Sequence, residues 1–421
     1  MIGVAIGIDL GTSGIRAALV DARRDVVAMT SASIAAADRT CPDAWWRALR
    51  EAIGALAQET NLIDVESIAV DGTSGTILPV DTTGRPLAPA SLYNAYADAT
   101  DVARVARIAP PGSAARGASS PLARALAWRN LKDWAYLQHE ADWLAGRLCG
   151  QFGLSDWNNA LKTGYDPAIP GWPEWLRALD LDPALLPEVV PPGQTIGRIS
   201  PPIAQIVQLP TAVRIVAGTT DGCAAFLATG AADVGDGVTS LGTTLTLKML
   251  SPRPVRAPDY GIYSHRIGSL WVPGGASNTG GGALAKYFSA TQLEALSARI
   301  DPSISSALDF YPLSSAGERF PISDPALPPR ETPRPADDVA FLHGMLESIA
   351  RIEAAGYRRL ADLGAPLVRR VFTVGGGARN PAWTDTRARV LGEAMQGVEL
   401  RPPRALEAAV GTAGLALGPF S

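Results

Sequence analysis

Cysteine and histidine are scarce in this sequence, with three residues of each in a chain of 421. They stand at Cys41, Cys149, Cys223, His139, His265 and His343. An odd number of widely separated cysteines fits neither a disulfide framework nor a metal site, and no histidine has a second ligand at metal-binding spacing. The sequence therefore predicts a protein of a reducing cytoplasm, whose histidines are structural or surface residues.

Blocks of like charge are also missing, and the net charge is only −4 at pH 7. Nucleic acid binding depends on clustered Lys and Arg, so no nucleic acid partner is expected. The apolar run at residues 1–11 lacks a basic flank, is interrupted by Asp9 and is too short to cross a bilayer. We therefore expect no membrane partner, and the run is typical of a buried strand.

Two nucleotide-binding motifs are absent as well. No G-x-x-x-x-G-K-[ST] occurs, which excludes a P-loop kinase, and no G-x-G-x-x-G follows a predicted strand, which disfavours dinucleotide binding. A phosphate-binding site is therefore expected at other glycine-rich turns of the chain.

Strand and helix patterns alternate along the first half of the chain. The predicted elements are strands at 4–8, 15–20 and 66–70, a turn at 11–14, a helix at 43–58 and a hairpin turn at 81–84. This alternation, the length of 421 residues and a hydrophobic fraction of 47% favour two α/β domains. The stretch at 190–213 is interpreted as the approach to the second domain, so the predicted domains are 1–212 and 213–421.

The opening pattern returns after Val213. A strand at 213–217 leads into a helix at 223–230, and a strand–turn–strand follows at 237–248. One turn pattern occurs once in each half of the chain, as Leu10-Gly-Thr-Ser13 and as Leu241-Gly-Thr-Thr244.

The segment from Asp9 to Arg16 is the first candidate site. Gly11 and Gly14 permit close backbone approach, and the turn's N–H groups with the hydroxyls of Thr12 and Ser13 suit phosphate oxygens. Asp9 is a candidate to hold Mg²⁺, through water, and Arg16 to reach a phosphoryl group. The alternative is an ordinary tight hairpin with polar turn residues.

The second candidate is Gly218-Thr-Thr-Asp221, where a buried strand meets a helix. A sugar hydroxyl needs a positioned carboxylate to accept its proton, and Asp221 suits that role. The alternative is that Asp221 only caps the helix, as Asp often does.

Two further glycine clusters precede predicted helices, at 372–380 and 274–282. The first is a strand running into a glycine turn, where a flat ring or a phosphate chain can lie against bare backbone. Either cluster is equally consistent with a structural loop.

Together these segments resemble the FGGY carbohydrate kinase family of the actin/hexokinase-like superfamily. The resemblance rests on six motifs in order, at 9–16, 71–76, 218–221, 240–244, 375–380 and 407–413. Further segments at 155–165, 263–265, 274–278 and 317–322 resemble a short cyanobacterial and plant subgroup, described as D-ribulose kinases or xylulose-kinase-like proteins. The family usually has a lysine where this chain offers Arg124.

The resemblance implies two α/β domains of the actin/hexokinase-like, or ribonuclease-H-like, fold with a cleft between them. It implies a sugar-binding domain at 1–212, a nucleotide-binding domain at 213–421, and the cofactors ATP and Mg²⁺. Asp221 is the implied general base. The implied sugar contacts are Asp9, Ser13, Ser74 and Asp221. The implied nucleotide contacts are Gly11, Thr12, Ser13, Arg16, Gly242, Thr243, Gly376, Gly377 and Asn380, with Asp9 at the metal.

D-ribulose is the first expected acceptor, phosphorylated at its terminal hydroxyl. The alternatives are a kinase for D-xylulose, L-ribulose, glycerol or erythritol, or an ATPase of the same fold without a sugar acceptor. Specificity among stereoisomers depends on a few hydrogen bonds whose directions one sequence does not reveal.

Overall fold

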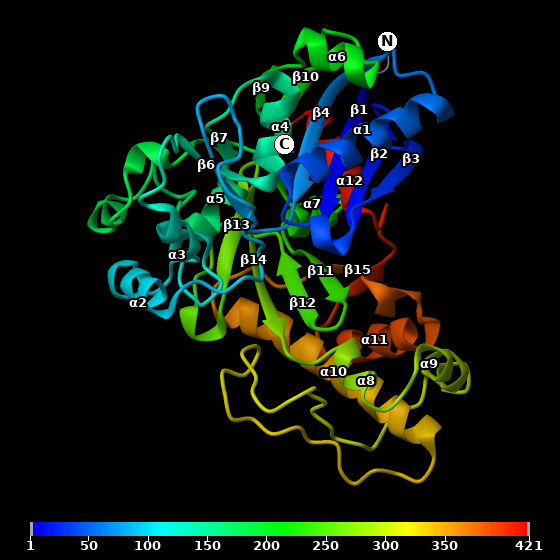
Figure 1. Cartoon of the computed structure of the whole chain (residues 1–421). Helices are drawn as coiled ribbons and strands as arrows, with labels where there is room; N and C mark the ends of the chain where they lie inside the picture. Colours follow the sequence, from blue (N-terminus) through cyan, green and yellow to red (C-terminus); the bar gives the residue numbers. More distant parts are fainter. Residues whose placement is uncertain (1–2, 419–421) are drawn as a thin grey trace. The chain divides into compact units, whose positions relative to one another are not determined.

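The computed structural model describes residues 3–418, which form two compact units (Figure 1). The first unit contains Met1–Ala228, His265–Gly268 and Glu407–Ser421, and the second contains Thr229–Ser264 and Ser269–Leu406. The predicted two-domain α/β architecture is confirmed. The assignment of sugar binding to 1–212 and nucleotide binding to 213–421 stays a prediction.

A six-stranded mixed sheet organises the first unit. Its order is β3 (Val26–Ser33), β2 (Gly14–Val20), β1 (Val4–Gly11), β4 (Val65–Gly72), β10 (Arg214–Thr220) and β9 (Thr195–Arg198). β1, β4 and β10 are parallel, whereas β2 and β9 are antiparallel to their neighbours. The parallel strands are apolar on both faces because helices cover both sides of the sheet.

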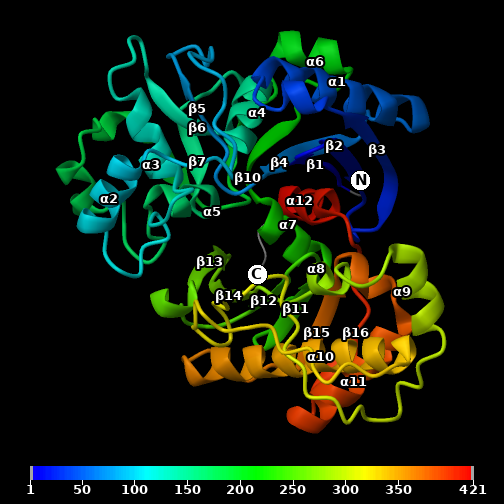
Figure 2. The same ribbon diagram turned by 60° about the horizontal axis from the view of Figure 1, so that its bottom comes forward.

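The helices of the first unit are α1 (Pro42–Glu59), α2 (Ala99–Ile108), α3 (Pro121–Ala125), α4 (Glu140–Cys149), α5 (Trp157–Ala160), α6 (Pro201–Val207), α7 (Asp221–Ala228) and α12 (Ala408–Leu417). α1 and α4 pack on one face of the sheet, and α7 and α12 pack on the other (Figure 2). Small residues permit the second contact, since a Cβ on Gly7 would lie 2.0 Å from the carbonyl oxygen of Ala409. Two short sheets complete the unit, β5 (Ile77–Val80) with β6 (Tyr136–His139) and β7 (Leu154–Asp156) with β8 (Glu188–Val190).

A second six-stranded sheet has the order β13 (Tyr263–Ile267), β14 (Leu270–Ser277), β12 (Leu245–Met249), β11 (Asp236–Leu241), β15 (Arg370–Val374) and β16 (Glu399–Arg401). The helices of the second unit are α8 (Gly281–Leu284), α9 (Ala290–Ser297), α10 (Asp338–Asp362) and α11 (Pro381–Ala394). The β11–β12 hairpin with the parallel strand β15 repeats the arrangement of the β1–β2 hairpin with β4. The predicted internal repeat is therefore confirmed at the level of strand topology.

Short 3₁₀ helices occur at η1 (Ala36–Asp38), η2 (Leu126–Trp128), η3 (Leu161–Thr163), η4 (Glu174–Ala178), η5 (Pro183–Leu185), η6 (Pro258–Tyr260) and η7 (Gly376–Arg379). Within residues 3–418, no helix combines the length and apolar character needed to cross a membrane.

Three details differ from the sequence-based expectations. The stretch at 190–213 contains β9 and α6, and the strand that follows it, β10, lies in the first sheet. The first part of the cluster at 274–282 is extended in β14 rather than turned. The predicted turn at 81–84 is present, closed by a hydrogen bond from the Gly84 N–H to the Asp81 carbonyl at 3.0 Å, but the returning segment meets β5 through the isolated bridges Val80–Pro86 and Ile77–Ser91 rather than as a regular strand.

Candidate active site

Three parallel strands of the first sheet end at the same edge, and each brings a carboxyl group there. Asp9 of β1 is the register partner of Asp71 on β4, and Thr219 of β10 is the register partner of Asp71 on the other side. Asp221 follows two residues later, as the first residue of α7. The carboxyl ends of parallel strands are where open α/β sheets commonly place their ligands.

Asp9 and Asp71 are neighbouring buried carboxyl groups, and the pKa of each is raised. Asp71 is fully buried and accepts a hydrogen bond from the Thr412 hydroxyl of α12. Burial raises the pKa of Asp71 well above its ordinary value, and the charge of Asp9 raises it further. Burial also raises the pKa of Asp9, but the hydrogen bond from Asp71 and the charge of Arg16 oppose the rise. Of the two carboxyl groups, Asp71 is therefore the one whose surroundings favour the protonated form more strongly.

Asp221 stands at the junction of β10 and α7. A register shift between Val216 and Thr219 brings the end of β10 close to β4, where a Cβ on Gly218 would lie 1.7 Å from a backbone oxygen. The Asp221 carboxylate accepts a hydrogen bond from the Gly222 N–H at 2.6 Å. Its charge contributes to the raised pKa values of Asp9 and Asp71, so the three carboxyl groups lie within electrostatic reach of one another. Asp221 is therefore not only the first residue of α7 but also part of a site with three carboxyl groups.

The turn after β4, residues 73–76, is held from several sides. The Ser74 carbonyl accepts from the Lys162 ammonium at 3.2 Å, and the Gly75 carbonyl accepts from the Arg124 guanidinium. Arg124 also donates to the hydroxyl of Ser91, at 2.8 Å. The buried hydroxyl oxygen of Ser74 has no hydrogen-bond partner among residues 3–418. A buried hydroxyl without a partner is costly, so this atom is well suited to a ligand.

Glu140 begins α4 and is a fourth acidic residue in this region, buried like Asp9 and Asp71. Its Oε1 accepts from both the N–H and the hydroxyl of Thr73, each at 2.5 Å. Burial raises the pKa of Glu140 to about 8, with a smaller contribution from the charges of Asp221 and Asp9. Glu140 is therefore mostly protonated near neutral pH.

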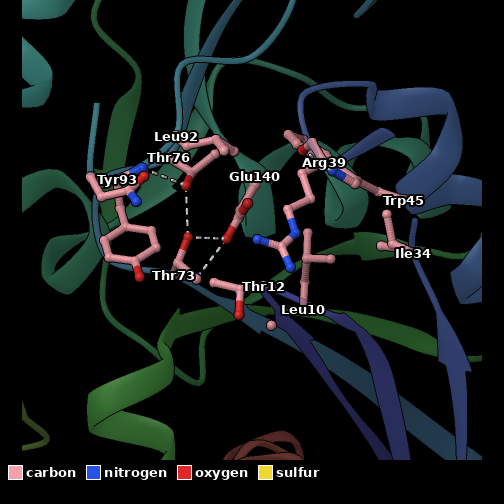
Figure 3. Close-up of a pocket in the computed structure, with 12 residues that line it drawn as sticks. Leu10, Thr12, Ile34, Arg39, Trp45, Thr73, Thr76, Leu92, Tyr93 and Glu140 are labelled. Atoms are coloured by element: carbon pink, nitrogen blue, oxygen red, sulfur yellow. Dashed lines mark hydrogen bonds between the residues drawn. The ribbon is translucent and has the colours of Figure 1, made fainter. Parts of the chain in front are cut away.

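A small cavity of about 140 Å³ opens beside these groups, entirely within the first unit (Figure 3). Its lining includes Gly11 and Thr12 of the first turn, Thr73, and the Glu140 carboxyl group. The side chain of Arg39 also extends into this region, and its buried Nε has no hydrogen-bond partner in the described chain. The cavity therefore joins the first candidate phosphate turn to the turn after β4.

The predicted first phosphate turn is the two-residue connection between β1 and β2. Gly11 pairs with Gly14, and Thr12 and Ser13 between them are exposed. Arg16 lies on β2, with its Nη1 3.4 Å from Asp9 Oδ2 and its Nε 3.6 Å from Glu407 Oε2. The hydroxyls and backbone donors of the turn are accessible, as the prediction requires.

The second predicted phosphate turn connects β11 to β12 in the second unit. Glycines 280–282 pack beneath it, because the N–H groups of Gly281 and Gly282 donate to the carbonyls of Gly242 and Thr243 at 2.8 and 2.9 Å. A Cβ on Gly281 would lie 2.9 Å from the Gly242 carbonyl oxygen. This part of the 274–282 cluster therefore supports the turn at Gly242 and Thr243.

The predicted adenosine turn follows β15, the parallel neighbour of β11. Gly375 has a φ of 85°, and Gly376 is open, since a Cβ there would meet no atom within 4 Å. Gly377 packs closely on Trp383. The side chain of Asn380 accepts from the Trp383 N–H at 3.1 Å and donates to the Ser297 hydroxyl at 2.7 Å, so it caps α11. Contact of Gly376, Gly377 and Asn380 with adenosine stays a prediction.

Both halves of the chain are similar to one family of known proteins. Residues 4–107 match the N-terminal domain of the FGGY family of carbohydrate kinases, and residues 237–417 match the C-terminal domain of the same family. This chain belongs to the FGGY family of carbohydrate kinases. The resemblance inferred from its six motifs is thereby confirmed.

Several relatives of this FGGY kinase carry a more specific name. A xylulose kinase of Streptomyces coelicolor is 28% identical over 99% of this chain and 88% of its own length. A xylulose kinase of Escherichia coli is 28% identical over 92% of this chain and 85% of its own length. The fold is shared with the xylulose kinase structure from Rhodospirillum rubrum, at a TM-score of 0.82 and 23% identity over 98% of this chain and 89% of that one.

The FGGY kinase structure also fits a divalent metal ion at Asp9. The described residues contain no group of three or more His, Cys, Asp or Glu side chains placed to share a metal. Mg²⁺ does not need such a cage, because it commonly uses one or two carboxylates together with water and substrate phosphates. The Asp9 carboxyl group beside the first turn offers oxygen ligands of this kind, and its metal role stays a prediction.

Sequence reasoning overlooked part of this site. Glu140 and Lys162 were not singled out, and Asp71 was quoted only as the start of a motif. Asp71 stands at a strand end like Asp9, which was a usable indication. Nothing local distinguishes Glu140 from an acidic residue in the first turn of any helix. Arg124, which replaces the usual family lysine, supports the turn after β4.

Proposed function

We propose that this FGGY kinase transfers the γ-phosphoryl group of ATP to the terminal hydroxyl group of a ketopentose. The observation that carries the proposal is the convergence of three strand ends, which brings Asp221, the Asp9–Asp71 pair and the Ser74 hydroxyl to one edge of the first sheet. A kinase of a neutral sugar needs a base for the hydroxyl proton, a charge that organises the metal and fixed polar groups for the sugar. In this proposal Asp221 is the base, Asp9 provides the charge for the metal, and the Ser74 hydroxyl is a polar group for the sugar.

Asp221 accepts the proton of the attacking hydroxyl. General-base assistance of this kind accounts for about 10²–10⁴ in rate. Ser74 and Ser13 hydrogen-bond the sugar, together with Asp9 and Asp221. Burial raises the pKa of Asp71 well above its ordinary value, and a proton on Asp71 reduces the mutual repulsion among the acids.

ATP is bound through the glycine turns. Gly11, Thr12, Ser13 and Arg16 contact phosphate in the first unit, whereas Gly242, Thr243, Gly376, Gly377 and Asn380 contact the nucleotide in the second. Asp9 holds Mg²⁺, which supplies charge neutralisation at the phosphates when bound. Support for a nucleotide role comes from the shared fold with a Plasmodium falciparum glycerol kinase solved with ADP, at a TM-score of 0.82 and 15% identity over 99% of this chain and 89% of that one.

D-xylulose is the first acceptor to test, because the curated relatives over nearly the whole chain are named xylulose kinase. D-ribulose, expected from the resemblance to the short subgroup, has no specific support among these relatives and is the second acceptor. The two ketoses differ only in configuration at C3, so one or two hydrogen bonds decide between them.

The decisive experiment measures ADP release with a panel of ketoses and polyols that includes D-xylulose, D-ribulose, L-ribulose, glycerol and erythritol. A ketopentose kinase shows stimulation by a ketopentose well above the ATP background. Stimulation by glycerol or erythritol alone would redirect the proposal to another polyol, and stimulation by none would leave an ATPase of this fold.

Asp221→Ala tests the base. We expect kcat to fall at least a hundredfold while ATP binding, measured by calorimetry, stays within about threefold of the parent. Near-normal turnover in this variant would remove Asp221 from the role of base.

A further inference from the structure

We propose that Glu140 is a positioning residue of this kinase, which holds the turn of residues 73–76 in the geometry that binds the acceptor sugar. This inference rests on the proposed function, since it concerns the sugar side of the same site. Glu140 lies about 70 residues beyond the turn in sequence, so only the tertiary structure reveals the connection.

Glu140 closes the turn from both of its ends. The side chain accepts from the N–H and the hydroxyl of Thr73, at 2.5 Å each, and the backbone N–H of Glu140 donates to the carbonyl of Thr76 at 3.2 Å. The turn itself is closed by a hydrogen bond from the Thr76 N–H to the Thr73 carbonyl, at 3.4 Å. One residue at the start of α4 therefore fixes the first and last members of the turn.

The hydrogen bonds continue from the turn to a second segment. The hydroxyls of Thr73 and Thr76 lie 2.7 Å apart, and the Thr76 hydroxyl accepts from the Tyr93 N–H at 3.0 Å (Figure 3). Thr76 is fully buried, and Thr73 and Glu140 are 6% and 4% exposed. Loss of the Glu140 acceptor would therefore leave the buried Thr73 N–H without its partner and take one of the two partners of the Thr73 hydroxyl.

The turn carries the atoms that a ligand would meet. Ser74 lies between Thr73 and Thr76, and its buried hydroxyl oxygen is unpartnered in the described residues. Lys162 and Arg124 hold the carbonyls of residues 74 and 75 from the other side. Every carbonyl of the turn thus has a donor, while the Ser74 hydroxyl remains for the sugar.

Close packing leaves the Glu140 side chain little conformational freedom. A Cβ on Gly72, at the end of β4, would lie 2.9 Å from Cγ of Glu140. A methyl group at residue 72 would therefore push the Glu140 side chain away from Thr73 without removing any polar atom. The raised pKa of Glu140 also indicates a neutral group near pH 7, and a glutamine oxygen can make the same two acceptor contacts.

The test compares steady-state kinetics of Glu140→Ala, Glu140→Gln and Gly72→Ala with the parent enzyme, using the ketopentose that it accepts best. We expect Glu140→Ala and Gly72→Ala to raise the KM for the ketose about tenfold or more, with the KM for ATP changed less than about threefold. Glu140→Gln should stay within about threefold of the parent for both substrates, because it keeps the acceptor oxygen.

Gln138→Leu is the matched control, since Gln138 is a fully buried polar residue on β6 whose amide nitrogen donates to the Leu154 carbonyl, away from the turn of residues 73–76. Gln138→Leu should lower the melting temperature, but the ratio of the KM for the ketose to the KM for ATP should stay the same as in the parent. The proposal is overturned if Glu140→Ala leaves the ketose KM unchanged, if it raises the KM for ATP equally, or if Glu140→Gln is as impaired as Glu140→Ala in a folded protein. A parent enzyme that accepts no ketose would instead refute the proposed function.

Discussion

Replacing Glu140 by glutamine should make the stability of this protein less dependent on pH. Burial raises the pKa of Glu140 to about 8, from an ordinary value of 4.5. Between these two values the unfolded chain releases the proton while the folded protein retains it. The folded state then binds more protons than the unfolded state, so stability falls as the pH rises through this window. Glutamine has no proton to lose and removes this contribution.

The size of the effect follows from linkage. Integration from pH 5 to pH 8, with a pKa of about 8 in the folded state and 4.5 in the unfolded state, gives a loss of about 3–4 kcal/mol from this one group. The difference in unfolding free energy between Glu140→Gln and the parent should therefore shift by about 3–4 kcal/mol in favour of the variant over that interval. Since the hydrogen bonds to Thr73 persist in the variant, little stability should change at pH 5.

Urea denaturation at pH 5, 6.5 and 8, monitored by circular dichroism, measures this shift. The matched control is Glu294→Gln on α9, where the side chain is exposed and meets water in both states. Its unfolding free energy should follow that of the parent at all three pH values. Parallel curves for Glu140→Gln and the parent would refute the reasoning, because they would mean that Glu140 is ionised in the folded protein at neutral pH.

Three further predictions address the metal, the strand contact and the core of the second unit. Asp9→Ala should raise the Mg²⁺ concentration needed for half-maximal activity, and an unchanged Mg²⁺ titration would count against a metal role for Asp9. Gly218→Ala should abolish most activity and lower the melting temperature, because its Cβ would meet a carbonyl oxygen of β4 at 1.7 Å, and a normal thermal melt would contradict this. Arg387→Ala should destabilise the protein by about 3–5 kcal/mol, because it strands Glu353, whose buried carboxylate lies 2.7 Å from the guanidinium. The exposed Arg401→Ala should cost less than about 1 kcal/mol in the same denaturation assay, and equal losses would show that burial of the pair is unimportant.

Much of the architecture was predictable because its determinants are local. Val4–Ile8, the glycine turn after it and the amphipathic segment at 43–58 each carry their own periodicity or turn chemistry, and all became the expected elements. The strand–turn–strand at 237–248 was predicted in the same way and confirmed. The cluster at 274–282 was misread in part, since glycine in a strand and glycine in a turn look alike until the neighbouring backbone is known.

The order of motifs along the chain was sufficient to predict the family and the approximate place of the site. Asp9 and Asp221 were recognisable because a carboxylate near the end of an apolar strand, with glycines beside it, is visible in the local sequence. Their assigned roles, and those of Ser13, Ser74 and the glycine turns, remain proposals that the experiments above address.

By itself, the sequence determined the class of element at each segment, the repeated hairpin and the membership of the FGGY family. Only the tertiary structure decided which acids are buried side by side, which atom of the turn after β4 lacks a partner, and that Glu140 holds that turn. The physical reason is that the pKa values and hydrogen bonds of Asp71 and Glu140 depend on burial and on neighbours far away in sequence, Thr412 for the first and Thr73 for the second. Periodicity reports which face of an element is buried, but not which side chain it meets there.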